Sequence, residues 1–128
     1  MKFFGFVVLA AATLVAVPLS AHHAATGYDR DHPITVIGTV TKFTFANPHV
    51  QIYFDGKDPN GEMQSWVAVS GTPRGLFKAG WKRNSLKPGD QITVTGGPSK
   101  DGKFRLGIKS LMVDTGSSKG LTLGVGPE

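Results

Sequence analysis

The 128-residue chain contains no cysteine, which excludes disulfide bonds, thiolate zinc sites, iron–sulfur ligation and cysteine nucleophiles. Charged residues are also scarce, at 18% of the chain, and the 8 Phe, 2 Trp and 2 Tyr are too many for a disordered protein. Glycine is abundant, with 17 residues, and this argues against a helical bundle. The length has room for one small domain, and the composition predicts a compact, β-rich one.

The first 21 residues read MKFFGFVVLAAATLVAVPLSA and are typical of a secretory signal peptide, with a cation at Lys2 and small residues up to Ala21. An uncleaved anchor is the weaker alternative, because the apolar run is short for a membrane span and no basic flank follows it. We expect cleavage after Ala21, a periplasmic or secreted location, and a mature chain that starts at His22 and is no integral membrane protein. With export, the net charge of +5 indicates anionic surfaces or partners rather than nucleic acid.

Side-chain alternation predicts strands over 33–45, 49–55, 63–69, 91–95 and 103–113. In the first, the inward parity changes just past Gly38, as in a long strand that bends through a bulge. The inward parity of the third stays undecided. Between the third and fourth strands, Thr72-Pro73 opens a short helix, Leu76 and Phe77 form its apolar face, and Gly80 ends it.

This order of elements predicts an all-β fold: a small five-stranded, OB-like Greek-key barrel with one short helix between the third and fourth strands. A generic small barrel or an open sandwich is the alternative. The chain then divides into a signal peptide (1–21), a histidine-containing N-terminal segment (22–32), the barrel (33–114) and a glycine-rich tail (115–128), which either adds a short last strand or frays.

Several segments together resemble a bacterial family of small exported proteins classed as a domain of unknown function. They are His22-His23, the strand Pro33–Val40, Asn47-Pro48-His49, Trp66 and the run GWKRNSLKPGD from Gly80 to Asp90. The resemblance extends over nearly the whole mature chain. It implies an exported, barrel-like domain and brings no established activity with it.

The sharpest chemical feature is His22 at the expected new N-terminus. Its α-amine and imidazole can chelate one metal ion, and the further imidazoles of His23 and His49 make a nitrogen site suited to Cu(II), the candidate cofactor. His32 is a weaker fourth ligand, and Met63 and Met112 are interpreted as core residues. The alternative is that the paired histidines are a solvated stub and His49 only forms hydrogen bonds beside its Pro turn.

A second candidate is a surface for an anionic or sugar-like ligand or an envelope protein, formed where cations and aromatic rings alternate near the helix. Its main residues are Tyr53, Arg74, Trp81 and Arg83, with Trp66, Lys78 and Lys82 around them. Alternatively, Trp81 caps the barrel end under basic side chains, and Trp66, for which this interpretation is favoured, belongs to the core.

Catalytic patterns are weak: the serines lie outside any nucleophile-elbow motif, and the glycines form no phosphate-binding loop before a helix. We therefore expect no enzyme, but an exported, non-enzymatic binding module with a copper-type ion at His22, His23 and His49. The alternative is a structural or protein-interaction domain of the cell envelope without metal. A copper oxidase-like enzyme that uses the same terminal site is a third, weaker class.

Overall fold

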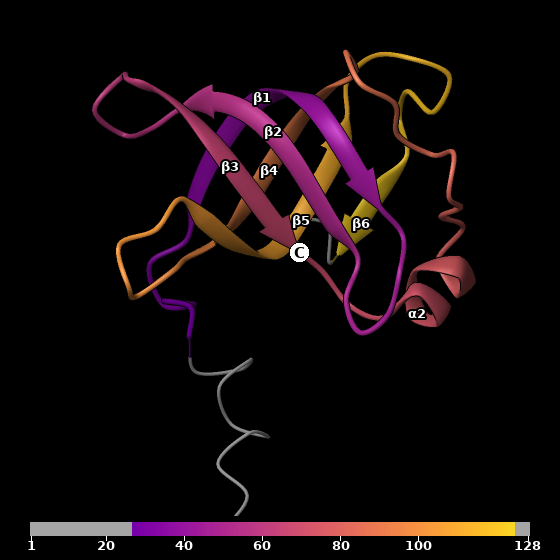
Figure 1. Cartoon of the computed structure of the whole chain (residues 1–128), viewed down its shortest axis with the longest axis horizontal. Coiled ribbons are helices and arrows are strands. Elements are labelled where there is room, and N and C mark those ends of the chain that lie inside the picture. Colours follow the sequence, from indigo (N-terminus) through magenta and orange to yellow (C-terminus); the bar gives the residue numbers. More distant parts are fainter. Residues whose placement is uncertain (1–26, 125–128) are drawn as a thin grey trace, which may run out of the picture.

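The computed structural model describes residues 27–124, so the expected signal peptide, His22 and His23 lie outside the described residues. Within that range the chain forms strands and one short helix, labelled in Figure 1. In order they are β1 (Ile34–Thr44), β2 (Gln51–Lys57), β3 (Met63–Val69), α2 (Pro73–Lys78), β4 (Gln91–Pro98), β5 (Arg105–Val113) and β6 (Thr122–Gly124). No helix in residues 27–124 is both long and apolar enough to cross a membrane.

The strands form one sheet in the order β3-β2-β1-β4-β5-β6. It closes into a barrel because β3 also pairs in parallel with β5, which puts Val67 opposite Arg105 and Val69 opposite Gly107. Figure 1 shows the barrel strands wrapped around one another, with α2 to one side. This closed five-stranded barrel, with its short helix between the third and fourth strands, confirms the predicted OB-like fold and excludes the open sandwich. The short β6 lies against the far side of β5.

The bend of β1 lies further along the strand than its sequence predicts. The pairing of β1 with β2 shifts register between Val40 and Lys42, so the inward parity passes to Phe43 two residues later than expected. Gly38 instead allows β2 to come close, since a Cβ at this position would lie 2.6 Å from the ring of Phe54.

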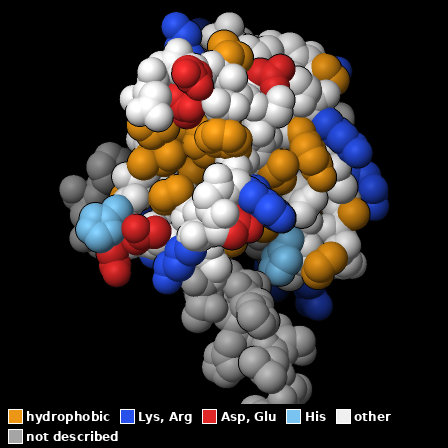
Figure 2. Space-filling model, turned by 60° about the vertical axis from the view of Figure 1, so that its left-hand side comes forward, with side chains coloured by type: hydrophobic (Ala, Val, Ile, Leu, Met, Phe, Trp, Pro, Cys, Tyr) orange, Lys and Arg blue, Asp and Glu red, His pale blue; other side chains and the backbone are white. Residues whose placement is uncertain are grey.

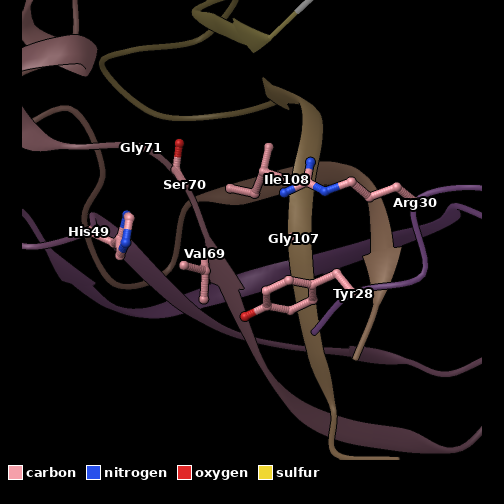
Figure 3. Close-up of a pocket in the computed structure, with 8 residues that line it drawn as sticks. All are labelled: Tyr28, Arg30, His49, Val69, Ser70, Gly71, Gly107 and Ile108. Carbon is pink, nitrogen blue, oxygen red and sulfur yellow. The ribbon is translucent and has the colours of Figure 1, made fainter. Parts of the chain in front are cut away.

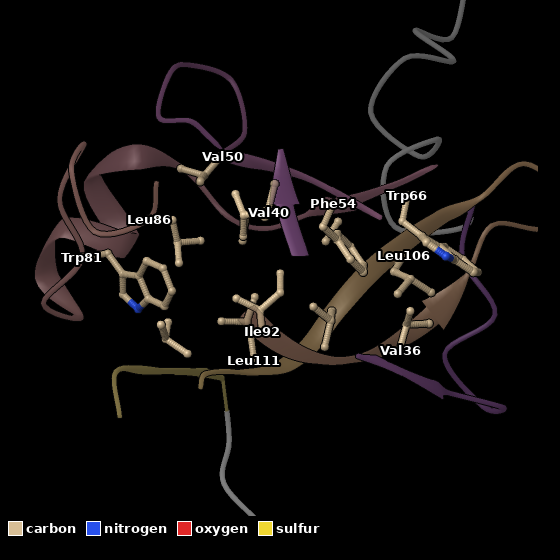
Figure 4. Close-up of a cluster of buried hydrophobic side chains, with 14 of the residues drawn as sticks. Val36, Val40, Val50, Phe54, Trp66, Trp81, Leu86, Ile92, Leu106 and Leu111 are labelled. Atoms are coloured by element: carbon tan, nitrogen blue, oxygen red, sulfur yellow. The ribbon is translucent and has the colours of Figure 1, made fainter. Parts of the chain in front are cut away.

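The core fills the barrel with apolar side chains from all five barrel strands (Figure 4). On β4, the inward residues are Ile92 and Val94, as the alternation predicts. On β3, Trp66 and Ala68 point inward, which decides the parity that the sequence left open. Leu76, Trp81 and Leu86 close the barrel from the segment that contains α2.

Both tryptophans are buried and anchored by hydrogen bonds. Trp66 stacks on Phe54, with ring centroids 6.5 Å apart, and its Nε1–H donates to the carbonyl oxygen of Gly56 over 3.1 Å. Trp81 is 0% exposed, and its Nε1–H donates to the carbonyl oxygen of Thr122 over 3.0 Å. The interpretation of Trp66 as a core residue is therefore confirmed.

Helix α2 begins and ends where its sequence predicts. Thr72 Oγ1 accepts the N–H of Gly75 over 3.2 Å, and Gly80 follows the helix with a φ of +93°. Only Leu76 is buried, whereas Phe77 is 63% exposed, so the expected two-residue apolar face is wrong. Consecutive helical residues point about 100° apart, and a helix this short presents one of the two to the barrel.

Other predictions fail at strand ends and on the outer surface. β2 begins at Gln51 rather than at His49, β4 continues to Pro98, and β5 begins at Arg105. Met63 and Met112 are 63% and 47% exposed, so their interpretation as core residues is wrong. Each lies on a strand face that points away from the barrel interior.

Candidate functional site

A cavity of about 370 Å³ opens beside the parallel pairing of β3 with β5 (Figure 3). Four separate segments contribute to it: the chain before β1, the loop before β2, the end of β3 and the middle of β5. Its lining residues are Tyr28, Arg30, His49, Val69, Ser70, Gly71, Gly107 and Ile108. Of the predicted site residues, His49 alone lines this cavity.

His49 is held beside the end of β3 by its neighbour in the chain. The N–H of Val50 donates to the carbonyl oxygen of Gly71, and the N–H of Ser70 donates to the carbonyl oxygen of Val50, both over 2.9 Å. The His49 side chain is half-buried, and its Nδ1 is buried without a hydrogen-bond partner among residues 27–124. An unpaired buried polar atom costs about 1–3 kcal/mol, so this nitrogen is a natural position for a ligand.

The segment before β1 is fixed to the barrel next to this histidine. The N–H of Asp29 donates to the carbonyl oxygen of Pro98, and the N–H of Lys100 donates to that of Gly27, each over 2.9 Å. Tyr28 lies across Gly107, where a Cβ would be 2.9 Å from the ring. The segment thereby brings Tyr28 and Arg30 into the same cavity as His49.

The cavity combines an imidazole, a guanidinium and two hydroxyl groups above a floor that includes two glycines. Figure 3 shows His49 at one end and Arg30 at the other, with Ser70 between them. These groups can donate hydrogen bonds, and the imidazole nitrogen can also ligate a metal. The arrangement can bind a small polar ligand or contribute one nitrogen ligand to a metal ion.

Sequence reasoning missed Tyr28, Arg30 and Ser70. The available signal was the glycines within strands, because a glycine there marks a position where another segment approaches closely. Gly107 receives the ring of Tyr28, and a Cβ at Gly97 would lie 2.8 Å from the carbonyl carbon of Asp29. Both strand glycines therefore record the position of the N-terminal segment.

His32 makes a separate, exposed pair with Asp29. Its Nδ1 lies 3.1 Å from Oδ2 of Asp29, and the two side chains are 83% and 37% exposed. Desolvation acts to raise the pKa of the Asp29 carboxyl, but the hydrogen bond and charge of His32 outweigh it and hold this pKa below 3.8. His32 is not among the residues that line the cavity. Within residues 27–124, no three His, Asp or Glu side chains are grouped to hold a metal ion.

The second predicted site, around Trp81, does not form as expected. Trp81 is buried and cannot contact a ligand, because its ring belongs to the core and its N–H is already bonded. Tyr53 lies on the outer face of β2, Arg74 is exposed on α2, and Arg83 is exposed in the loop that follows. No hydrogen bond or ion pair in the described part of the chain joins these three residues.

Comparison with known protein families gives one match, to a family of unknown function, DUF6152, over residues 10–109. The chain belongs to this family. The match includes most of the barrel and confirms that the resemblance to an unknown-function family is real. Membership in DUF6152 assigns no activity, so function has to be argued from the site.

No curated protein matches the chain significantly in sequence. Among solved structures, the chain is similar to the mitochondrial single-stranded DNA binding protein Rim1 from S. cerevisiae, with 10% identity, a TM-score of 0.46 and 64% and 92% coverage of this chain and that one. It is also similar to TiaS in complex with agmatine (16% identity, TM-score 0.45, 67% and 22% coverage). In the TiaS complex with tRNA, AMPCPP and agmatine the values are 17%, 0.46, 79% and 28%. The chain thus spans about a quarter of TiaS, and likenesses this remote carry no functional argument.

Proposed function

We propose that this DUF6152 protein is an exported, non-enzymatic binding module for a copper-type divalent ion. The ligands are the α-amine and imidazole of His22, the imidazole of His23, and His49 from the barrel. The observation that carries the proposal is the buried, unpartnered Nδ1 of His49 in a cavity that the N-terminal segment also lines. Cu(II) is the favoured ion because it stands highest in the affinity order for nitrogen ligands.

The length of the N-terminal segment supports this set of ligands. Tyr28 lines the cavity that contains His49, and His23 precedes Tyr28 by five residues, a reach of up to about 17 Å. The segment from Gly27 onward is tied to the β4–β5 hairpin by backbone hydrogen bonds. A terminus anchored this close loses less freedom when it binds a metal together with His49 than a free tail would.

Copper titration of the exported protein, with its N-terminus sequenced, tests the proposal. Calorimetry and EPR are expected to give one tight Cu(II) site with nitrogen ligands. An extra Ala before His22 moves the α-amine away from its imidazole, and His49→Ala removes the barrel ligand, so we expect each to weaken binding by at least about tenfold. His32→Ala is the matched control, because that exposed histidine lies outside the cavity.

A synthetic peptide of residues 22–28 provides the reference for a terminus without the barrel. The intact protein is expected to bind Cu(II) more tightly than this peptide, because only the protein adds His49. Equal affinity of peptide and protein, or affinity unchanged by His49→Ala, would overturn the proposal.

A further inference from the structure

Four residues lie side by side across the outer face of the barrel and form a continuous row. Cross-strand pairing joins Lys42 to Tyr53, Tyr53 to Val67 and Val67 to Arg105. The row therefore crosses four strands, β1, β2, β3 and β5, over about 14 Å at the usual strand spacing. Its side chains point outward because the next residue along each of three strands is buried: Phe54, Trp66 and Leu106.

The tyrosine at the centre of this outer row is held in place from two sides. Nζ of Lys42 lies 5.3 Å from the centre of the Tyr53 ring, a cation–π contact. The Tyr53 hydroxyl donates to Oε1 of Gln51 over 3.0 Å. Gln51 also faces outward, and its own amide N–H groups are available as donors beside the row.

The cations of the row are not neutralised by neighbouring carboxylates. Within residues 27–124, the only ion pairs within 4.0 Å are His32–Asp29 and Lys103–Asp101, so none involves Lys42, Arg105 or Arg30. The nearest acids already have partners, since Asp101 accepts the Ser99 hydroxyl over 2.6 Å and Asp55 accepts the Ser65 hydroxyl over 3.1 Å. Nε of Arg105 is buried without a partner.

The next row along the sheet leads from these cations to the cavity. Gln51 pairs with Val69, and Val69 pairs with Gly107, which lies beneath the ring of Tyr28. Arg30 follows at the cavity itself. Figure 2 shows Lys and Arg side chains beside hydrophobic groups over one face of the molecule. The two rows and the cavity margin thus combine cations, tyrosine rings and amide and hydroxyl donors along one path.

We propose that this outer face, with Lys42, Tyr53, Arg105 and Arg30 as its main contacts, binds an extended acidic oligosaccharide. Unpaired cations spread over several strands suit carboxylates repeated along a chain, and the donors between them suit sugar hydroxyls. Nucleic acid is the less favoured ligand because Lys42 already lies over the Tyr53 ring, whereas single strands bind by stacking bases on free rings. The choice of a carbohydrate also rests on the proposed export.

Calorimetry and NMR titration with a galacturonic acid hexamer test this inference, with maltohexaose as the neutral probe and dT₆ as the nucleic-acid probe. We expect the acidic hexamer alone to bind measurably and its affinity to fall as salt rises. Lys42→Gln and Arg30→Gln are each expected to weaken binding about three- to fivefold, the size of one exposed ion pair. Lys78→Gln on α2 removes the same charge elsewhere and should change nothing.

Arg105→Gln is the sharper but riskier variant, because this side chain is half-buried. Its thermal melt is therefore recorded first, and the exposed Lys42 and Arg30 variants carry the result if it unfolds. Equal binding of maltohexaose, tighter binding of dT₆, or an affinity that Lys78→Gln lowers as much as Lys42→Gln would each overturn the proposal. Absence of binding to the acidic hexamer at low salt would do the same.

The copper site and the carbohydrate face can fail independently. His49→Ala should abolish the barrel's part in copper binding but leave the affinity for the acidic hexamer unchanged, because His49 is not among the proposed sugar contacts. Lys42→Gln should have the opposite effect. Copper binding without sugar binding would overturn only the carbohydrate proposal, and the reverse result only the metal proposal.

Discussion

The ring of Tyr28 lies directly on the backbone of Gly107, and a side chain at that glycine has no room. A Cβ built there would be 2.9 Å from Cγ of Tyr28. This contact, together with the hydrogen bonds from Asp29 and Lys100, holds the N-terminal segment on the barrel next to His49. The composition of the cavity therefore depends on a single missing side chain in β5.

Gly107→Ala is expected to lower the free energy of unfolding by about 1–3 kcal/mol, because it forces the Tyr28 ring or the β5 backbone to move. Urea denaturation measures this loss. In a Tyr28→Ala background the same substitution should cost clearly less, since the obstructing ring is gone. An equal cost in both backgrounds would show that the Tyr28–Gly107 contact does not limit this position.

Trp81→Ala is expected to destabilise the protein by about 3–5 kcal/mol, because it leaves a cavity in the core and removes a hydrogen bond to Thr122. The exposed neighbour Arg83 supplies the control, and Arg83→Ala should stay within about 0.5 kcal/mol of the parent. Both values come from urea unfolding curves. A mild effect of Trp81→Ala would contradict its assignment as a core residue.

Thr72→Ala should cost about 1 kcal/mol, because it removes the oxygen that accepts the N–H of Gly75 at the start of α2. Thr72→Ser keeps this acceptor and should retain most of the stability. Thermal melts of the three proteins, followed by near-UV circular dichroism of the tryptophans, make the comparison. If serine and alanine destabilise the protein equally, the capping bond is not the cause.

Asp58 predicts a loss of stability in acid. The backbone N–H of Glu62 is the largest influence on its carboxylate, and with the Gln64 amide and Asn60 N–H it holds the pKa of Asp58 below 3.8, although desolvation acts to raise it. A lowered folded pKa stabilises the fold above the unfolded value, and this contribution is lost as pH falls through the folded pKa.

Thermal midpoints measured between pH 6 and pH 2 should therefore fall in the acid range, and less steeply in Asp58→Asn than in the parent. NMR titration should place the Asp58 carboxyl below 3.8. Asp29 and Asp101 also have lowered pKa values, so part of the acid dependence should persist in the variant. An unchanged slope in Asp58→Asn would contradict a contribution from this residue.

Much of the fold is predictable from local patterns. β3 has the bounds that its sequence predicts, Ile92 and Val94 alternate into the core of β4, and Thr72 begins α2. The parity of β3 was not predictable, because Trp66 and Ala68 on one side and Val67 and Val69 on the other are all apolar. The closed barrel buries the first pair and leaves the second half-exposed.

The candidate site was less predictable than the fold. His49 stood out because histidine chemistry can be recognised from residue type, whereas its unpaired Nδ1 and its cavity appear only in three dimensions. Trp81 suggested a surface beside Arg83 because the two are close in sequence. The barrel instead turns Trp81 into the core, where the buried area of a large ring gives the greater stabilisation.

By itself, the sequence determined the class of fold, the strands of the barrel, the position of α2 and membership in DUF6152, because these depend on alternation, capping and motifs within short stretches. Only the tertiary structure decided that Val67 lies beside Arg105 and that Tyr28 and His49 line one cavity. Such neighbours come from distant parts of the chain. Their proximity results from closure of β3 onto β5, which side-chain periodicity does not encode.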